Sequence, residues 1–173
     1  LTLNAGIAGG ADIILIPEIP YDIDKIVDAI NQRVAHGSRF TILAVAEGAI
    51  SKENAELPKK KLREKLAKKT YPSVSYEIAA QLEEKTGQEI RVTVPGHTKR
   101  GGSPSPYDRV LATRLGSEAA RLILAKEFGV MVAIINREIS KVPLEEVAGK
   151  LKMVAPDSEI VSAAKNMGIS FGD

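Results

Sequence analysis

The sequence predicts a three-layer α/β/α domain built on a largely parallel sheet. Short apolar runs rich in β-branched residues alternate with longer segments whose apolar residues recur at helical spacing. Glycine or proline ends most of these segments, as expected at the boundaries of helices and buried strands. With 173 residues, of which 44% are hydrophobic, the chain can bury the core of one ordinary domain. We therefore expect residues 1–173 to form a single domain.

The first part of the chain is predicted to form a helix followed by one β-α-β unit. Residues 1–10 have apolar side chains at helical spacing and end in two glycines. Residues 12–16 form a continuous apolar run closed by a proline, which is typical of a buried strand in a parallel sheet. Asp22 is placed to cap a helix with one apolar face, which Gly37 ends. Residues 40–45 supply the second buried strand.

A basic insertion is predicted at about residues 51–71. Lysine and arginine crowd positions 59–69, where Glu64 is the only acidic residue. Such a cluster could bind an anionic effector or a nucleic acid, but no aromatic platform for stacking bases accompanies it. The pattern therefore favours a partly helical segment whose charges are solvated.

Helices and strands alternate again beyond the insertion. We expect a helix over 73–86, a strand over 90–94, a long helix over 106–128 that buries Val110, Leu111, Leu115 and Leu122, a strand over 130–135, and short helices over 143–151 and 157–167. Helices that alternate with buried strands indicate a Rossmann-like fold with a largely parallel sheet. Ligands of such folds bind beyond the carboxyl ends of the strands.

Composition and charge exclude several functional classes. A formal net charge of +2 is too small to indicate general binding to nucleic acids or membranes. The chain has no cysteine, and its two histidines lie far apart in sequence, so no thiolate or histidine metal site is expected. The sequence contains neither a signal peptide nor an apolar run long enough to span a bilayer, so we expect a cytoplasmic protein. Because the chain begins at Leu1 in what resembles a helix already under way, we expect a fragment.

Residues 91–102 are predicted to bind a phosphate. Arg91, His97 and Arg100 lie around a predicted strand end and a loop in which three glycines permit close backbone approach to a ligand. One guanidinium group can donate two parallel hydrogen bonds to the oxygens of a phosphate. An imidazole and the backbone amides of a turn supply further donors. Spacing alone leaves an alternative equally open, namely a turn whose basic side chains are solvated.

A longer string around this loop resembles the signature of the 6-phosphofructokinases. It reads PGHTKRGGSPSPYDRVLATRLG over residues 95–116. The resemblance continues upstream in LTL at 1–3, AGGAD at 8–12, ILIPEI at 14–19 and AVAEGA at 44–49. It covers most of the chain outside the insertion and the last thirty residues. An unrelated flavodoxin-like or receptor-like α/β module would have no reason to contain these strings.

The resemblance implies roles for four residues of a substrate site. Glu47 matches the strand-end carboxylate that binds fructose hydroxyls, and His97 and Arg100 match the pair that contacts the sugar and its 6-phosphate. Arg91 matches an arginine that reaches the 6-phosphate in a neighbouring subunit, which implies a homodimer or homotetramer. A carboxylate is a natural acceptor for vicinal hydroxyls, whereas without the resemblance Glu47 would be an ordinary loop acid.

The resemblance also indicates what this chain lacks. The family's Gly-Gly-Asp motif for the phosphoryl donor and its Thr-Ile-Asp-Asn-Asp segment, which supplies the catalytic base, do not occur here. We expect the C-terminal, fructose 6-phosphate-binding half of the enzyme, with no catalytic residue of its own and inactive alone. The absent N-terminal domain would bind ATP or pyrophosphate together with Mg²⁺. The alternative is a non-catalytic sugar-phosphate-binding or subunit-assembly domain.

Overall fold

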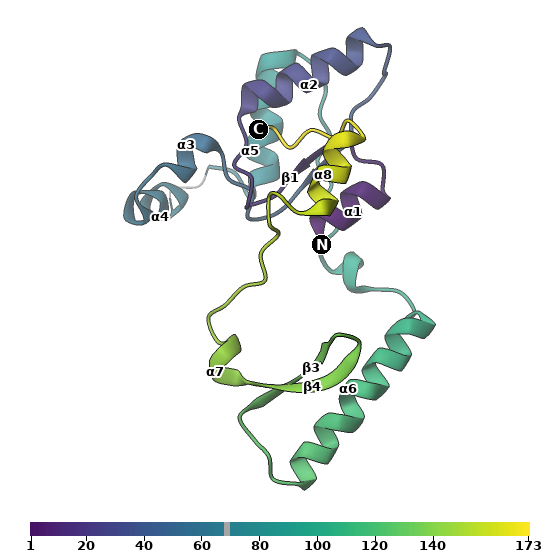
Figure 1. The fold of residues 1–173 in the computed structure, drawn as a ribbon. Coiled ribbons are helices and arrows are strands. Elements are labelled where there is room, and N and C mark those ends of the chain that lie inside the picture. Colours follow the sequence, from purple (N-terminus) through teal and green to yellow (C-terminus); the bar gives the residue numbers. More distant parts are fainter. Residues whose placement is uncertain (68–69) are drawn as a thin grey trace. The chain divides into compact units, whose positions relative to one another are not determined.

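A computed structural model describes residues 1–67 and 70–173, with the exception of the side chain of Arg100. The chain divides into two compact units (Figure 1). The first contains Leu1–Thr93 and Met153–Asp173, and the second contains Val94–Lys152. None of the described helices is both long and apolar enough to cross a membrane.

The first unit is organised around a short parallel sheet. Strands β1 (Ile13–Leu15) and β2 (Leu43–Val45) pair in parallel, with Ile13 opposite Leu43. On the other side of β1, the Ile14 N–H donates to the Ser170 carbonyl oxygen at 2.9 Å. A parallel bridge between Ile13 and Ser170 accompanies this bond. The segment at Ser170 therefore extends the sheet, and β1 lies at its centre.

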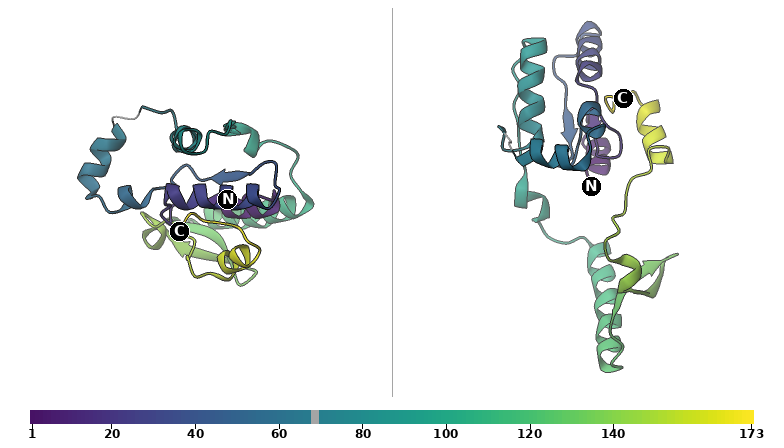
Figure 2. Two further views of the ribbon diagram at one scale, coloured as in Figure 1. Left: turned by 90° about the horizontal axis from the view of Figure 1, so that it is seen from above. Right: turned by 90° about the vertical axis from the view of Figure 1, so that its left-hand side faces the viewer.

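Helices cover both faces of this sheet (Figures 1 and 2). One face of β1 packs against α1 (Thr2–Ala8) and α8 (Glu159–Asn166), and the other against α2 (Ile23–Ala35) and α5 (Val74–Thr86). Because side chains alternate along a strand, Ile14 faces the first pair of helices while Ile13 and Leu15 face the second. All three are completely buried, each contributing about 1.5–3 kcal/mol of hydrophobic free energy. The predicted three-layer α/β/α arrangement is confirmed.

Local signals explain where the central helices begin and end. The Asp22 carboxylate accepts a hydrogen bond from the Asp24 N–H at 2.9 Å and so caps α2, as predicted. Helix α5 ends at Gly87, whose φ of 65° lies in the left-handed region that glycine adopts without strain. Lys85 of α5 pairs with Asp24 of α2 at 2.8 Å and joins the two helices on the same face of the sheet.

The basic insertion forms two short helices, α3 (Lys52–Ala55) and α4 (Lys59–Ala67). Within these two ranges no residue is buried, which confirms a partly helical and solvated segment. Residues 68 and 69, which we also assigned to the insertion, lie outside the described residues.

The second unit consists of a long helix and a β-hairpin. Helix α6 (Pro106–Leu124) begins with a capping box formed by Ser105 and Asp108. Strands β3 (Val130–Ile135) and β4 (Glu138–Pro143) pair antiparallel, and α7 (Leu144–Val147) follows. Asn136 and Arg137 form the two-residue turn with φ values of 52° and 70°, the positive angles that tight hairpins require.

Four expectations about single elements are wrong, and one strand was missed. Residues 90–94, all of them described, form no strand, and the helix expected over 143–151 is only the single turn Leu144–Val147. Strand β4 was not predicted at all. The long helix stops at Leu124, and of its four apolar residues expected inside only Leu122 is buried. The physical reason is that a lone hairpin offers α6 too little apolar surface to cover its whole length.

Candidate functional site

Glu47 lies just beyond the carboxyl end of β2, at the edge of the sheet where ligands of α/β folds bind. Its loop is fixed by backbone hydrogen bonds, because the Tyr21 N–H donates to the Ile50 carbonyl at 3.0 Å and the Lys52 N–H donates to the Tyr21 carbonyl at 2.8 Å. A Cβ on Gly48 would lie 3.1 Å from the Pro17 side chain, so the loops after β1 and β2 approach each other closely here. The side chain of Glu47 is exposed.

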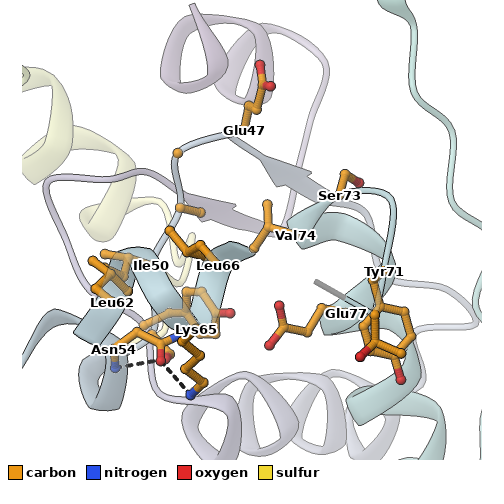
Figure 3. A pocket seen from close by; sticks show the side chains of 15 residues that line it. Glu47, Ile50, Asn54, Leu62, Lys65, Leu66, Tyr71, Ser73, Val74 and Glu77 are labelled. Carbon is orange, nitrogen blue, oxygen red and sulfur yellow. Dashed lines mark hydrogen bonds between the residues drawn. The ribbon is translucent and has the colours of Figure 1, made fainter. Parts of the chain in front are cut away.

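The loop of Glu47 forms one wall of a cavity of about 360 Å³. The other walls come from the insertion, through Asn54, Lys65 and the leucines of α4, and from the beginning of α5. Figure 3 shows that the side chains of Lys65 and Glu77 face the space between α4 and α5, while the carboxylate of Glu47 points away from them. Glu47 therefore borders this cavity without reaching into it.

A buried tyrosine lies against the same cavity. The side chain of Tyr21 is 3% exposed, and burial, assisted by the negative charge of Glu77, raises its pKa to about 12. Tyr21 is therefore neutral at physiological pH, and its phenol can donate a hydrogen bond. Sequence reasoning did not find Tyr21 or Glu77 and included Lys65 only as a member of the basic cluster at 59–69, because no local pattern links three residues so far apart in the chain.

Arg91 lies in the first unit but not at this cavity. Its Nε contacts Glu89 Oε1 at 2.9 Å, and its side chain is 85% exposed. It lines a separate cavity of about 310 Å³ together with Arg39 and Phe40. An exposed ion pair of this kind contributes little to stability, so the guanidinium can exchange Glu89 for another anion at small cost.

His97 and Arg100 belong to the second unit. Both lie in the short 3₁₀ helix Gly96–Arg100, where His97 is exposed, while the side chain of Arg100 lies outside the described part of the chain. The expected backbone freedom of the glycines is used, because Gly96 and Gly102 have φ values of 53° and 95°. The four predicted site residues are thus divided between the two units, with Glu47 and Arg91 in the first.

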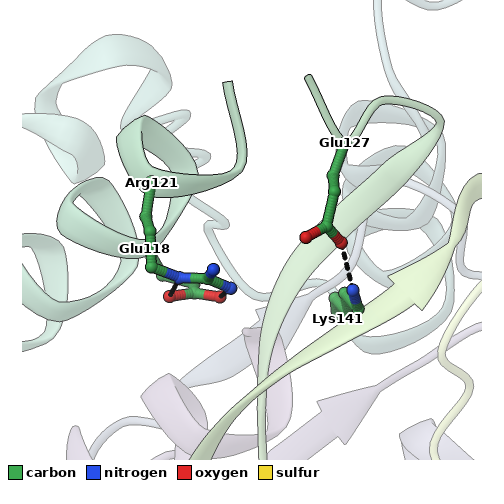
Figure 4. A network of polar contacts seen from close by, with 4 residues as sticks. All are labelled: Glu118, Arg121, Glu127 and Lys141. Carbon is green, nitrogen blue, oxygen red and sulfur yellow. Dashed lines mark hydrogen bonds and ion pairs between the residues drawn. The ribbon is translucent and has the colours of Figure 1, made fainter. Parts of the chain in front are cut away.

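Two ion pairs lie near the carboxyl end of α6 in the second unit (Figure 4). Arg121 contacts Glu118 within α6 at 2.7 Å, and its hydrogen bond lowers the pKa of the Glu118 carboxyl. Lys141 of β4 pairs with Glu127, just beyond α6, and lowers the pKa of that carboxyl in the same way. Only the Lys141–Glu127 pair joins the hairpin to the end of α6, and because both of its side chains are exposed it contributes little to stability.

The described residues do not assemble a metal centre. Among residues 1–67 and 70–173, no group of three or more histidine, aspartate and glutamate side chains could hold a metal ion.

Comparison with known proteins finds one family model and relatives that match along the whole chain. The phosphofructokinase family model matches residues 1–123. The ATP-dependent 6-phosphofructokinase of Spirochaeta thermophila is 49% identical over 173 residues, which are 100% of this chain and 47% of that protein. The chain spans about half the length of the curated relatives it matches.

Solved structures agree with this result. The phosphofructokinase of Pichia pastoris matches 96% of this chain and 16% of its own, with 32% identity and a TM-score of 0.63. A pyrophosphate-dependent phosphofructokinase from Marinobacter aquaeolei matches 98% of this chain and 44% of its own, with a TM-score of 0.69. Its 19% identity shows a common fold only. The Rossmann-like α/β fold class is confirmed.

Proposed function

Since this chain belongs to the phosphofructokinase family, we propose that it is the sugar-phosphate-binding part of a 6-phosphofructokinase. The complete enzyme transfers a phosphoryl group from ATP or pyrophosphate to the 1-hydroxyl of fructose 6-phosphate, as a cytoplasmic step of glycolysis. The observation that carries this proposal is the 49% identity, across the whole chain, to the ATP-dependent enzyme of Spirochaeta thermophila. The name of that relative favours ATP as the donor.

Four side chains of this chain hold the sugar phosphate in the proposed enzyme. Glu47, beyond the carboxyl end of β2, accepts hydrogen bonds from the fructose hydroxyls. His97 and Arg100 together contact the sugar and its 6-phosphate from a loop whose glycines let the backbone approach the ligand. Arg91 contacts the 6-phosphate bound by a neighbouring subunit. Its high exposure and its weak pairing with Glu89 leave it able to do so in a homodimer or homotetramer.

The phosphoryl donor and Mg²⁺ are held by residues outside this chain. In the proposed division, residues 1–173 form the fructose 6-phosphate-binding domain, with the basic insertion at about 51–71, and a separate domain binds the donor. Phosphoryl transfer requires donor, metal and acceptor to be aligned, so this chain alone is inactive. The length of the curated relatives, about twice that of this chain, supports this division.

The substrate site is tested by steady-state kinetics of the complete enzyme. Replacing Glu47, His97 or Arg100 with alanine removes a charged or hydrogen-bonding contact and should raise KM for fructose 6-phosphate about tenfold or more. The KM of the phosphoryl donor should change little. Kinetics identical to the unmodified enzyme in all three variants would reject the site.

The catalytic proposal is separated from the non-catalytic alternative by the rest of the gene. A Gly-Gly-Asp motif and a Thr-Ile-Asp-Asn-Asp segment upstream of Leu1 support a complete kinase. A native gene without both strings would leave only a sugar-phosphate-binding or assembly function. Turnover by the 173-residue chain itself, with ATP or pyrophosphate, would contradict the predicted division of the active site.

A further inference from the structure

The basic insertion has no role in the proposed function so far, yet it forms a wall of the cavity beside Glu47. This cavity of about 360 Å³ is of the size that small-molecule ligands occupy. It lies beyond the carboxyl end of β2, which is the end of a parallel strand where ligands of α/β folds bind. The loop of Glu47 lines this cavity, although the Glu47 carboxylate points away from it, so a ligand in the cavity would lie beside the loop.

Two charged side chains from different helices face the cavity without forming an ion pair. Lys65 comes from α4 and Glu77 from the first turn of α5 (Figure 3). None of the ion pairs found among the described residues contains Lys65, Glu77 or Glu47. Lys65 is nevertheless held in place, because its Nζ donates to Asn54 Oδ1 at 2.7 Å. A neutral amide acceptor orients the ammonium group without neutralising it, so its charge remains available to a ligand.

The beginning of α5 lines the same cavity. Ser73 occupies the N-cap position, but its side chain makes no capping hydrogen bond. Its Oγ is buried and has no hydrogen-bond partner among the described residues. The Tyr76 and Glu77 N–H groups donate to the Ser73 carbonyl oxygen at 3.2 and 3.3 Å. The N-terminus of α5 nevertheless carries the positive end of the helix dipole, which favours an anionic group on a ligand and acts in the same direction as the charge of Lys65.

Helix α4 packs only loosely against the rest of the first unit, because none of its residues is buried. Its apolar residues, Leu62 and Leu66, line the cavity, and no side chain within Lys59–Ala67 is buried. Leu66 remains 46% exposed. A ligand between α4 and α5 would cover both leucines, which adds a hydrophobic contribution to its binding.

We propose that Lys65 contacts a phosphate group of a phosphorylated substrate bound between α4 and α5. This inference rests on the proposed function, because it takes its ligand from that reaction. Glu77, on the opposite wall, accepts hydrogen bonds from hydroxyl groups of the same ligand. Sugar phosphate and nucleotide share this chemistry of hydroxyls and phosphate. If the insertion were only a solvated helix face, Lys65 would be equivalent to the lysines on the outer side of α4.

The test compares Lys65→Gln with Lys60→Gln in the complete enzyme. Lys60 belongs to the same helix but not to the cavity wall, so it matches Lys65 in charge and secondary structure. Lys65→Gln should raise KM about tenfold or more for the substrate whose phosphate Lys65 contacts, with kcat nearly unchanged. A change confined to fructose 6-phosphate identifies the sugar phosphate, and a change confined to ATP or pyrophosphate identifies the donor.

Further measurements distinguish contact with the substrate from a structural effect. Lys65→Arg should keep most of the affinity, and the difference between Lys65→Gln and the unmodified enzyme should shrink as salt is added, because salt screens exposed charges. Thermal unfolding midpoints of the Lys65 and Lys60 variants should agree. A salt-independent rise in KM accompanied by a lower midpoint would overturn the contact.

The inference and the proposed function fail in different ways. If Lys65→Gln has the same KM as Lys60→Gln for both substrates while Glu47→Ala and His97→Ala raise KM, the role of Lys65 is refuted and the proposed site stands. If Glu47→Ala and His97→Ala have no effect either, the proposed site is itself refuted.

Discussion

The close approach of α1 to the sheet gives a prediction about stability. A Cβ added at Gly6 would lie 2.7 Å from Ile14 Cδ1 and 3.2 Å from Ala44 Cβ, whereas carbon atoms in contact are normally about 3.5–4.0 Å apart. Ile14 is completely buried and belongs to the central strand, so it has little space in which to move. Gly6→Ala should therefore force α1 away from β1.

The size of the effect follows from two opposing terms. Overpacking by one methyl group costs about 1–3 kcal/mol, while alanine favours a helix over glycine by about 1 kcal/mol. The overpacking term should prevail, because the shortest contact is with a buried side chain on the central strand. We expect Gly6→Ala to lower the free energy of unfolding of the first unit by about 1 kcal/mol.

Gly116 provides a matched control, since it is also a helical glycine but a Cβ there would meet nothing within 4 Å. Gly116→Ala in α6 should therefore stabilise its helix by about 1 kcal/mol through propensity alone. Hydrogen exchange measured on peptides from α1–β1 and from α6 reports each unit separately. The packing argument is refuted if Gly6→Ala increases protection in α1 and β1 as Gly116→Ala does in α6.

Three further predictions concern pH, helix capping and subunit sharing. Because the folded pKa of Tyr21 is raised from 10.0 to about 12, its contribution to stability is complete below pH 10 and is lost as the pH rises through about 12. Urea midpoints of the unmodified chain should thus fall more steeply over that range than those of Tyr21→Phe, and parallel curves would contradict the raised pKa. Asp22→Ala should cost about 1 kcal/mol in urea unfolding, whereas Asp22→Ser should be nearly neutral; equal losses would show that capping is not the cause. If Arg91 serves a neighbouring subunit's site, mixed oligomers of Arg91→Ala and His97→Ala subunits should recover activity that neither variant has alone, and hybrids with no recovered activity would place Arg91 in its own subunit's site.

Much of the first unit could be predicted from local signals. The apolar run that became β1, the cap at Asp22 and the glycine after α5 each act within a few residues, so a single sequence displays them. The same holds for the position of Glu47, because a residue that follows a parallel strand must lie at the ligand-binding edge of the sheet. The roles of Glu47, Arg91, His97 and Arg100 remain predictions that rest on the family resemblance.

The hairpin of the second unit shows where local reasoning was insufficient. Its turn uses Asn136 and Arg137, and the second of these is not a residue that typically marks a tight hairpin. Strand β4 alternates polar and apolar residues, but it contains two charged residues and ends at Pro143. Its composition therefore did not predict a strand. Pairing with β3 holds it as a strand, and such pairing is a contact between segments rather than a property of one segment.

The sequence by itself determined the α/β class, the β1–α2–β2 unit and the strand-end position of Glu47, because periodicity, capping and chain breakers act over short distances. Only the tertiary structure decided that Ser170 extends the sheet beside β1, and that α1 and α8 cover one face while α2 and α5 cover the other. The same is true of the cavity that brings Tyr21, Lys65 and Glu77 together. These arrangements depend on packing between segments distant in the chain, and no local pattern in the sequence records which surfaces meet.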